Sequence, residues 1–150
     1  MRTTRKHRNK AAREARARPQ SSGQAEIFEP AQFLNIDVDV RSRRSLSALA
    51  SAWPWAQDPY GNSRWLYYSG HGRGRTAEAT ANELVEQVIA LPSLARRSWD
   101  LASKRTFDIG VQGGIGPRAF EKVQLSPETL ARISSIGART KLTVYPPQRG

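Results

Sequence analysis

The chain has 150 residues, a formal net charge of +11 and no cysteine. That length suits a single domain, and the lack of cysteine excludes disulfide bonds, thiolate metal sites and a cysteine nucleophile. No run approaches the ~18 apolar residues of a membrane-spanning helix, and no apolar secretory signal is present, so we expect a cytoplasmic protein without membrane contact. Only His7 and His71 are available for histidine-based chemistry.

The positive charge is concentrated at the N-terminus. Residues 1–20 carry eight basic side chains against the single acidic Glu14, whereas the other 130 residues carry 16 basic and 12 acidic ones. Residues 1–24 have almost no large apolar side chain, which predicts a disordered basic tail before one domain over residues 25–150. Clustered basic residues release counterions from nucleic-acid phosphates, so the tail is either a nucleic-acid arm or a solvated extension. The residues of the nucleic-acid interpretation are Arg2, Arg5, Lys6, Arg8, Lys10 and Arg13, with Arg73 and Arg75 from a later loop.

The predicted domain opens with a strand, a short helix and a second strand. Apolar and polar residues alternate over residues 34–40, which predicts a strand with one polar face. Ser42 suits the N-cap of a short helix that Pro54 ends. The aromatic-rich residues 64–69 then predict a second strand.

Two helical segments and a hairpin are predicted next. Apolar residues at helical spacing run from Thr76 to Pro92, where the proline interrupts the helix. A further helix is expected over residues 93–104. Residues 106–112 alternate as a strand does, and residues 120–125 are expected to return beside it as an antiparallel strand.

The last predicted helix carries the most complete set of end signals. Ser126 suits its N-cap, Pro127 its first turn, and Gly137 the left-handed position that ends a helix. Leu130 is the fourth residue of this helix, a position whose side chain commonly packs against the residue just before the N-cap, here Leu125. We therefore predict that Leu130 belongs to the core. Residues 140–145 are expected to form the last strand.

The resulting order of elements, β-α-β-α-α-β-β-α-β, indicates an α+β fold. The economical packing is a mainly antiparallel sheet with helices on one face, as in ferredoxin-like or related split βαβ folds.

Several segments carry a resemblance to a known family. They are Ile36-Asp37-Val38, Phe107-Asp108-Ile109, Leu125-Ser126-Pro127-Glu128-Thr129-Leu130, Ile136-Gly137-Ala138 and Leu142-Thr143-Val144-Tyr145. Together they resemble an uncharacterised bacterial domain-of-unknown-function family over about residues 33–146. The resemblance implies a small α+β domain and assigns no catalytic residues.

Three aspartates are candidates for metal binding or acid–base catalysis. Alternation places Asp37, Asp39 and Asp108 on the helix-free face of the sheet, with Lys141 and Thr143 from the last strand. Carboxylates gathered there can hold a divalent cation or transfer protons, as in a metal-dependent enzyme. The alternative, which we favour, is a polar sheet face whose aspartates pair with basic residues. It predicts neither a metal nor another cofactor.

Aromatic residues are concentrated between positions 53 and 68. Tyrosine and tryptophan are the residue types that protein interfaces favour, although part of this set is expected to cover the edge of the core. The candidate protein-binding residues are Trp55, Tyr60, Trp65, Tyr67 and Tyr68.

The other chemistry-bearing patterns are incomplete. Gly70–Arg75 lacks the ending of a phosphate-binding loop, and no Gly-x-Ser-x-Gly motif supports a serine nucleophile. We therefore predict a non-enzymatic domain that binds a protein partner, as an accessory or immunity-type protein does. Two alternatives stay open: nucleic-acid or ribosome association through the basic tail, and a metal-dependent enzyme using the three aspartates. Neither the partner's identity nor the oligomeric state follows from the sequence.

Overall fold

The computed structural model describes residues 29–147, except for residue 54, residues 72–74 and residues 117–122. The basic tail predicted over residues 1–24 therefore lies outside the described residues, as does Arg73. The elements are β1 (Gln32–Arg41), α1 (Ser47–Ala52), β2 (Trp65–His71), α2 (Ala77–Ile89), α3 (Ser93–Asp100), β3 (Lys104–Gln112), α4 (Pro127–Ser135) and β4 (Arg139–Tyr145).

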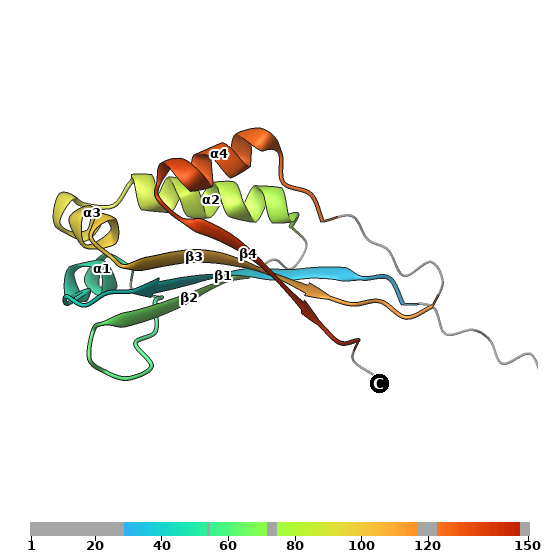
Figure 1. The fold of residues 1–150 in the computed structure, drawn as a ribbon, viewed down its shortest axis with the longest axis horizontal. Coiled ribbons are helices and arrows are strands. Elements are labelled where there is room, and N and C mark those ends of the chain that lie inside the picture. The colour runs from blue at the N-terminus through green and yellow to red at the C-terminus, as the bar shows by residue number, and fades with distance from the viewer. Residues whose placement is uncertain (1–28, 54, 72–74, 117–122, 148–150) are drawn as a thin grey trace, which may run out of the picture.

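The four strands form one mixed sheet in the order β2-β1-β3-β4 (Figure 1). β1 is antiparallel to both β2 and β3, whereas β3 and β4 are parallel. The α+β class is confirmed, but the expectation of a mainly antiparallel sheet is wrong, and the ferredoxin-like arrangement stays a prediction.

The error arises after β3, where a hairpin was expected. Residues 123–125 are not a strand, and the rest of the expected return strand lies outside the described residues. The chain reaches β4 through α4, and such a helical crossover joins strands that run in the same direction.

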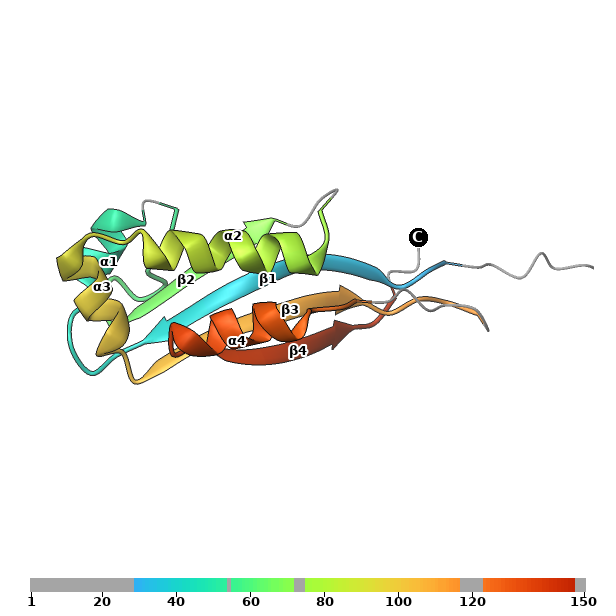
Figure 2. The same ribbon diagram turned by 90° about the horizontal axis from the view of Figure 1, so that it is seen from above.

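The helices cover one face of the sheet and one of its ends. Figures 1 and 2 show α2 and α4 lying side by side over the sheet, with α1 and α3 at the end where β1 finishes. The core lies between these layers. Its largest fully buried side chains include Trp99 from α3 and Phe107 from β3. The indole Nε1 of Trp99 donates to the backbone oxygen of Ile136 at 2.8 Å, which joins α3 to the end of α4.

Three of the four predicted helix starts are confirmed, near Thr76, at Ser93 and after Ser126. The side chain of Thr76 accepts a hydrogen bond from the backbone of Ala79, and Ser126 accepts one from Thr129, each at 3.1 Å. The left-handed φ of +71° at Gly137 ends α4 as expected.

The predicted cap at Ser42 is wrong, because α1 begins five residues later with Leu46 as its N-cap. Ser42 instead joins the end of β1 to the start of β2. Its backbone nitrogen donates to the backbone oxygen of Arg64 at 2.9 Å.

The prediction that Leu130 belongs to the core is also wrong, since its exposed fraction is 43%. The buried side of α4 and its end carries Thr129, Ile133 and Ile136, which are spaced four and three residues apart. Leu130 lies one residue past that stripe, so the helix turns it away from the core. Within the described residues, no helix has both the length and the apolar composition needed to cross a membrane.

Candidate functional site

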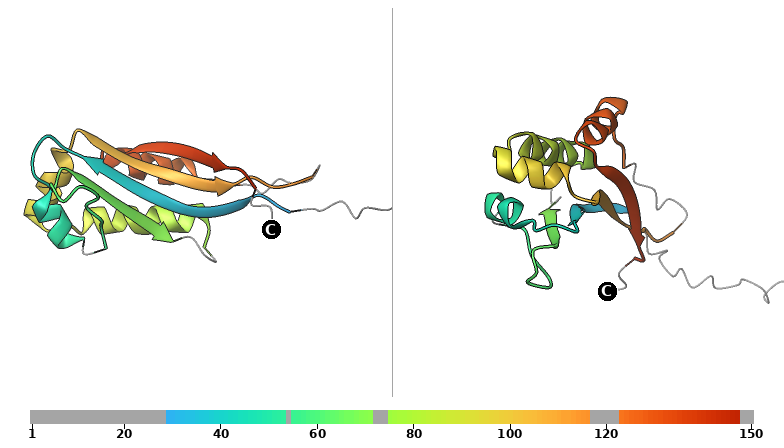
Figure 3. Two further views of the ribbon diagram at one scale, coloured as in Figure 1. Left: turned by 90° about the horizontal axis from the view of Figure 1, so that it is seen from below. Right: turned by 60° about the vertical axis from the view of Figure 1, so that its left-hand side comes forward.

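The helix-free face of the sheet brings together the three aspartates that the alternation placed there. Asp37 stands opposite Asp108 across the β1–β3 pair, and Asp39 lies two residues further along β1. Figure 3 shows this face uncovered by α2 and α4, which lie behind the sheet in the left-hand view.

Asp108 is held by two side chains of β4. Its Oδ2 accepts a hydrogen bond from the Nζ of Lys141 and its Oδ1 accepts one from the Oγ1 of Thr143, both at 2.7 Å. The hydrogen bond to Asp108 raises the pKa of Lys141, because the carboxylate favours the charged ammonium. The alternating sequence pattern places Lys141 and Thr143 on the same face of the sheet as Asp108, and both contacts agree with that prediction.

Asp39 lies between two basic side chains. Its Oδ2 accepts from the Nζ of Lys104 at 2.5 Å, and its Oδ1 accepts from the Nε of Arg41 at 3.2 Å. Burial raises the pKa of Asp39, but the hydrogen bonds from Lys104 and Arg41 outweigh it, so this pKa lies below its ordinary value.

Asp37 has neutral partners. It accepts a hydrogen bond from the side-chain amide of Asn35 at 2.7 Å. Burial and a hydrogen bond to Asp37 together raise the pKa of Tyr67 above its ordinary value. Each of the three carboxylates thus has its own partners. In the part of the chain that the structure describes, no group of three or more His, Asp or Glu side chains is arranged to hold a metal ion.

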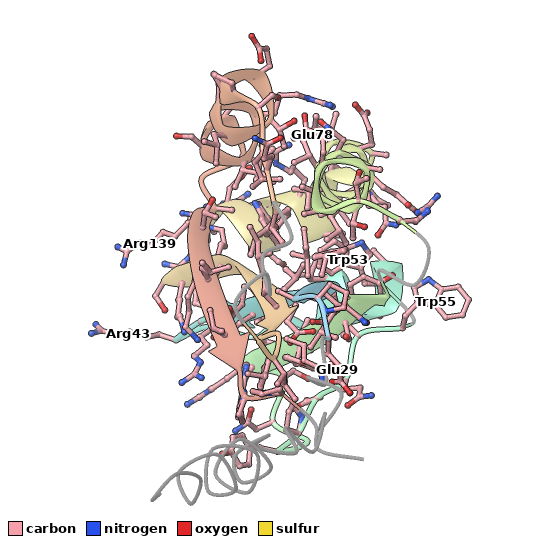
Figure 4. The ribbon with its side chains drawn as sticks, turned by 90° about the vertical axis from the view of Figure 1, so that its right-hand side faces the viewer. Glu29, Arg43, Trp53, Trp55, Glu78 and Arg139 are labelled. Carbon is pink, nitrogen blue, oxygen red and sulfur yellow. The ribbon has the colours of Figure 1, made fainter. Side chains whose placement is uncertain are left out.

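The aromatic segment divides between the core and the surface. Trp53 is buried, with its ring 5.7 Å from that of Trp99 and 5.8 Å from that of Tyr68. Tyr68 is half-buried and packs against the core, so only part of its side chain is accessible to a partner. Trp55, two residues after Trp53, is 73% exposed. Figure 4 shows Trp53 turned into the molecule and Trp55 turned away from it.

A stacked group lies beside the β2 edge. The ring of Tyr60 is 5.1 Å from the ring of Trp65, and the guanidinium carbon of Arg41 is 4.4 Å from the centre of the Trp65 ring. Tyr60 is 70% exposed. We call the side chains of Arg41, Tyr60 and Trp65, together with the exposed Trp55 on the segment before β2, the aromatic edge.

The turn between α1 and β2 positions these side chains. One carboxylate oxygen of Asp58 accepts from the backbone nitrogen of Ser63 at 2.7 Å, and the other accepts from that of Tyr60 at 3.3 Å. Two backbone hydrogen bonds between Gln57 and Tyr67, of 2.7 and 2.9 Å, attach the same segment to the outer edge of β2. The residues 58–62 are a turn signal in the sequence, whereas the Gln57 pairing is a backbone contact that leaves no sequence signal.

A polar cluster joins α2 to the start of α4, and sequence reasoning missed it. Glu78 accepts hydrogen bonds from the backbone nitrogen of Ser126 at 2.8 Å, from the Ser126 hydroxyl at 2.7 Å, and from the hydroxyl of Thr129. The hydrogen bond from Thr129, followed by those from Ser126, lowers the pKa of Glu78. Glu78 also lines a hollow of about 870 Å³ between the starts of the two helices, together with Phe33 and Arg75.

The basic residues of the nucleic-acid interpretation are not brought together in the described part of the chain. Six of them belong to the tail and Arg73 to residues 72–74, all outside the described residues. Arg75 forms an ion pair with Glu83 of α2.

Comparisons with models of known families, with curated proteins and with solved structures give no match. The resemblance of residues 33–146 to a bacterial family therefore stays a prediction.

Proposed function

We propose that this domain is a non-enzymatic binding module that recognises a protein partner through its aromatic edge. The observation that carries the proposal is the exposure of Trp55 and Tyr60, at 73% and 70%. Large aromatic side chains are costly to leave in water, and they are the residue type that dominates binding energy at protein interfaces.

The surroundings of these two side chains support the proposal. Arg41 lies over the Trp65 ring, and tyrosine, tryptophan and arginine are the three residue types most enriched among interface residues with large energetic effects. The Asp58 turn and the Gln57–Tyr67 backbone pair fix the segment that carries them. A segment fixed before binding loses less conformational entropy when a partner arrives.

The helix-free face supports a binding role rather than a catalytic one. Asp39 and Asp108 each accept hydrogen bonds from a lysine, so neither carboxylate is poised as a general base. Asp39 also accepts a hydrogen bond from Arg41 of the aromatic edge, so a charged pair borders that edge, as charged and polar groups do at the rim of a protein interface.

The test is capture of partners from a bacterial lysate, with and without nuclease treatment, by the full chain and by a Trp55→Ala, Tyr60→Ala variant. The matched control is Leu94→Ala, since Leu94 on α3 is 73% exposed, as Trp55 is, but lies outside the aromatic edge. We expect the wild type and Leu94→Ala to retain the same proteins and the double variant to lose them. Equal retention by the double variant, or loss of all bound protein on nuclease treatment, would contradict the proposal.

A further inference from the structure

The two outer edges of the sheet differ in how their backbone groups are used. At the outer edge of β2, the backbone of Tyr67 is already hydrogen-bonded to that of Gln57. β4 is the last strand of the sheet on the other side, and among the described residues no strand or bridge pairs with its outer edge. Unpaired edge groups are a ready template for another strand.

One hydrogen bond shows which residues of β4 direct their backbone outward. The backbone oxygen of Tyr145 accepts from the nitrogen of Gly113 at 2.8 Å, so Tyr145 directs its backbone groups toward β3. Alternate residues of a strand do the same, and the residues between them point the other way. Thr140, Leu142 and Val144 therefore present their N–H and C=O groups to the free edge.

Two of these three residues, Leu142 and Val144, also carry exposed apolar side chains. Leu142 is 60% exposed and Val144 is 62% exposed. Both lie on the side of the sheet where α4 packs, opposite to Lys141 and Thr143, but Figure 2 shows the last part of β4 extending past the first turn of α4.

We propose that two copies of this chain pair through β4 as antiparallel strands, with Leu142 on the two-fold axis, and so extend the sheet across the dimer. Leu142 is the middle residue of Arg139–Tyr145, so this is the register in which all seven residues of both strands are paired. The outward N–H and C=O groups of Leu142 then meet those of the second Leu142, and Thr140 meets the second copy's Val144.

The charges of the strand agree with this register. Lys141 stands opposite Thr143, and Arg139 stands opposite Tyr145, so no two like charges face each other across the interface. Arg139 extends away from its own sheet (Figure 4), which leaves its guanidinium able to approach the tyrosine ring of the second copy. A register shifted to centre on Lys141 would place two ammonium groups directly opposite each other, and the strands would repel.

Cysteine cross-linking tests the register directly, because the natural chain has no cysteine. In the proposed dimer the two Leu142 Cα atoms are about 5.5 Å apart, which is within the range that a disulfide spans. The matched control is Val144→Cys, which has the same exposure and strand face, but whose two copies are on the order of 13 Å apart at the usual rise per residue. We expect mild oxidation of full-length Leu142→Cys to give a covalent dimer and Val144→Cys to stay monomeric. A mixture of Thr140→Cys and Val144→Cys chains should cross-link although neither does alone.

Sedimentation of the full chain gives the second measurement. We expect a reversible dimer whose fraction rises with concentration, loss of that dimer in Leu142→Lys, and its retention in Leu94→Lys, with circular dichroism to verify folding. A wild type that is monomeric at every concentration, or a Val144→Cys chain that cross-links as readily as Leu142→Cys, would overturn the proposal.

Discussion

The helix-covered face of the sheet and its helix-free face are built from the same strands but are held together differently. On the covered face, Ile36 and Val38 of β1 and Phe107 of β3 are fully buried beneath the helices. On the free face, Asp37 and Asp39 alternate with Ile36 and Val38 along β1, and each carboxylate accepts hydrogen bonds from its own donors.

This difference separates stability from recognition. Burial of apolar surface contributes about 25 cal/mol per Å² to folding, whereas ion pairs at a solvated surface contribute little, because water and salt screen them. We therefore expect substitutions on the covered face to unfold the domain, and substitutions on the free face and the aromatic edge to leave it folded.

The largest expected effect is at Trp99, under the helices. Trp99→Ala removes a fully buried indole together with its hydrogen bond to Ile136, and such truncations cost about 3–5 kcal/mol of unfolding free energy. Trp55→Ala removes the same side chain from a 73% exposed position and should change that free energy by less than about 0.5 kcal/mol. Denaturant unfolding of both variants measures the contrast. A Trp55→Ala protein as unstable as Trp99→Ala would place Trp55 in the core and remove it from the aromatic edge.

The next effect concerns the polar cluster that joins α2 to α4 over the covered face. Glu78→Gln replaces a carboxylate that accepts hydrogen bonds from Ser126 and Thr129, and it should lower the unfolding free energy by about 1–2 kcal/mol. Glu128→Gln is the control, since Glu128 stands in the first turn of α4 as Glu78 stands in the first turn of α2, but lacks these contacts, and it should cost about 0.3 kcal/mol. Equal losses in the two variants would show that Glu78 acts only as a charge near the end of the helix.

The same carboxylate predicts a pH dependence. The pKa of Glu78 is lowered in the folded protein by hydrogen bonds from Thr129 and Ser126, so the unfolded chain binds the proton more tightly. The stabilisation is therefore fully present above the unfolded pKa of about 4.3 and is lost as the pH falls through the lower folded pKa. Unfolding free energies measured between neutral and acidic pH should fall less steeply in Glu78→Gln than in the wild type. An unchanged slope would contradict this assignment.

A smaller effect is expected at Leu130, which the sequence placed in the core and the structure exposes. Leu130→Ala should cost less than about 1 kcal/mol, whereas Ile133→Ala, at a 1% exposed position on the same helix, should cost about 2–5 kcal/mol. Thermal unfolding of the pair shows which side of α4 faces the core.

The elements that sequence predicted correctly are those with local signals. The alternation of β1, the helix start near Thr76 and the cap at Ser126 depend on neighbouring residues, and the structure confirms them. The parallel pairing of β3 with β4 follows from the crossover through α4, and the strand expected over residues 120–125 led to the wrong pairing. Leu130 was misplaced because its position relative to the N-cap does not show which side of α4 faces the core.

The same distinction holds for the candidate surfaces. The carboxylate set on the helix-free face was predictable, because a period of two fixes the face that each strand residue occupies. The division of the aromatic residues was only partly predictable, since Tyr68 is packed against the core through the ring of Trp53. The contact between Glu78 and Ser126 joins residues 48 positions apart, and two ordinary polar residues at that separation leave no signal in one sequence.

The smallest expected effect is on the helix-free face, and it tests whether the three aspartates hold a metal. Because Asp108 already accepts hydrogen bonds from Lys141 and Thr143, a cation would have to displace the ammonium before it bound. We expect the midpoint of thermal unfolding to stay unchanged when Mg²⁺, Ca²⁺ or Mn²⁺ is added, and Asp108→Asn to remain folded. An ion present at about 100 times its dissociation constant would raise the unfolding free energy by about 2.7 kcal/mol. A rise of that size in the wild type, lost in both Asp37→Asn and Asp108→Asn, would show that the helix-free face binds a metal ion. It would then favour the metal-dependent enzyme over the protein-binding module. If none of the three proteins shows a rise, the carboxylates of the helix-free face act only through their ion pairs and hydrogen bonds with neighbouring side chains.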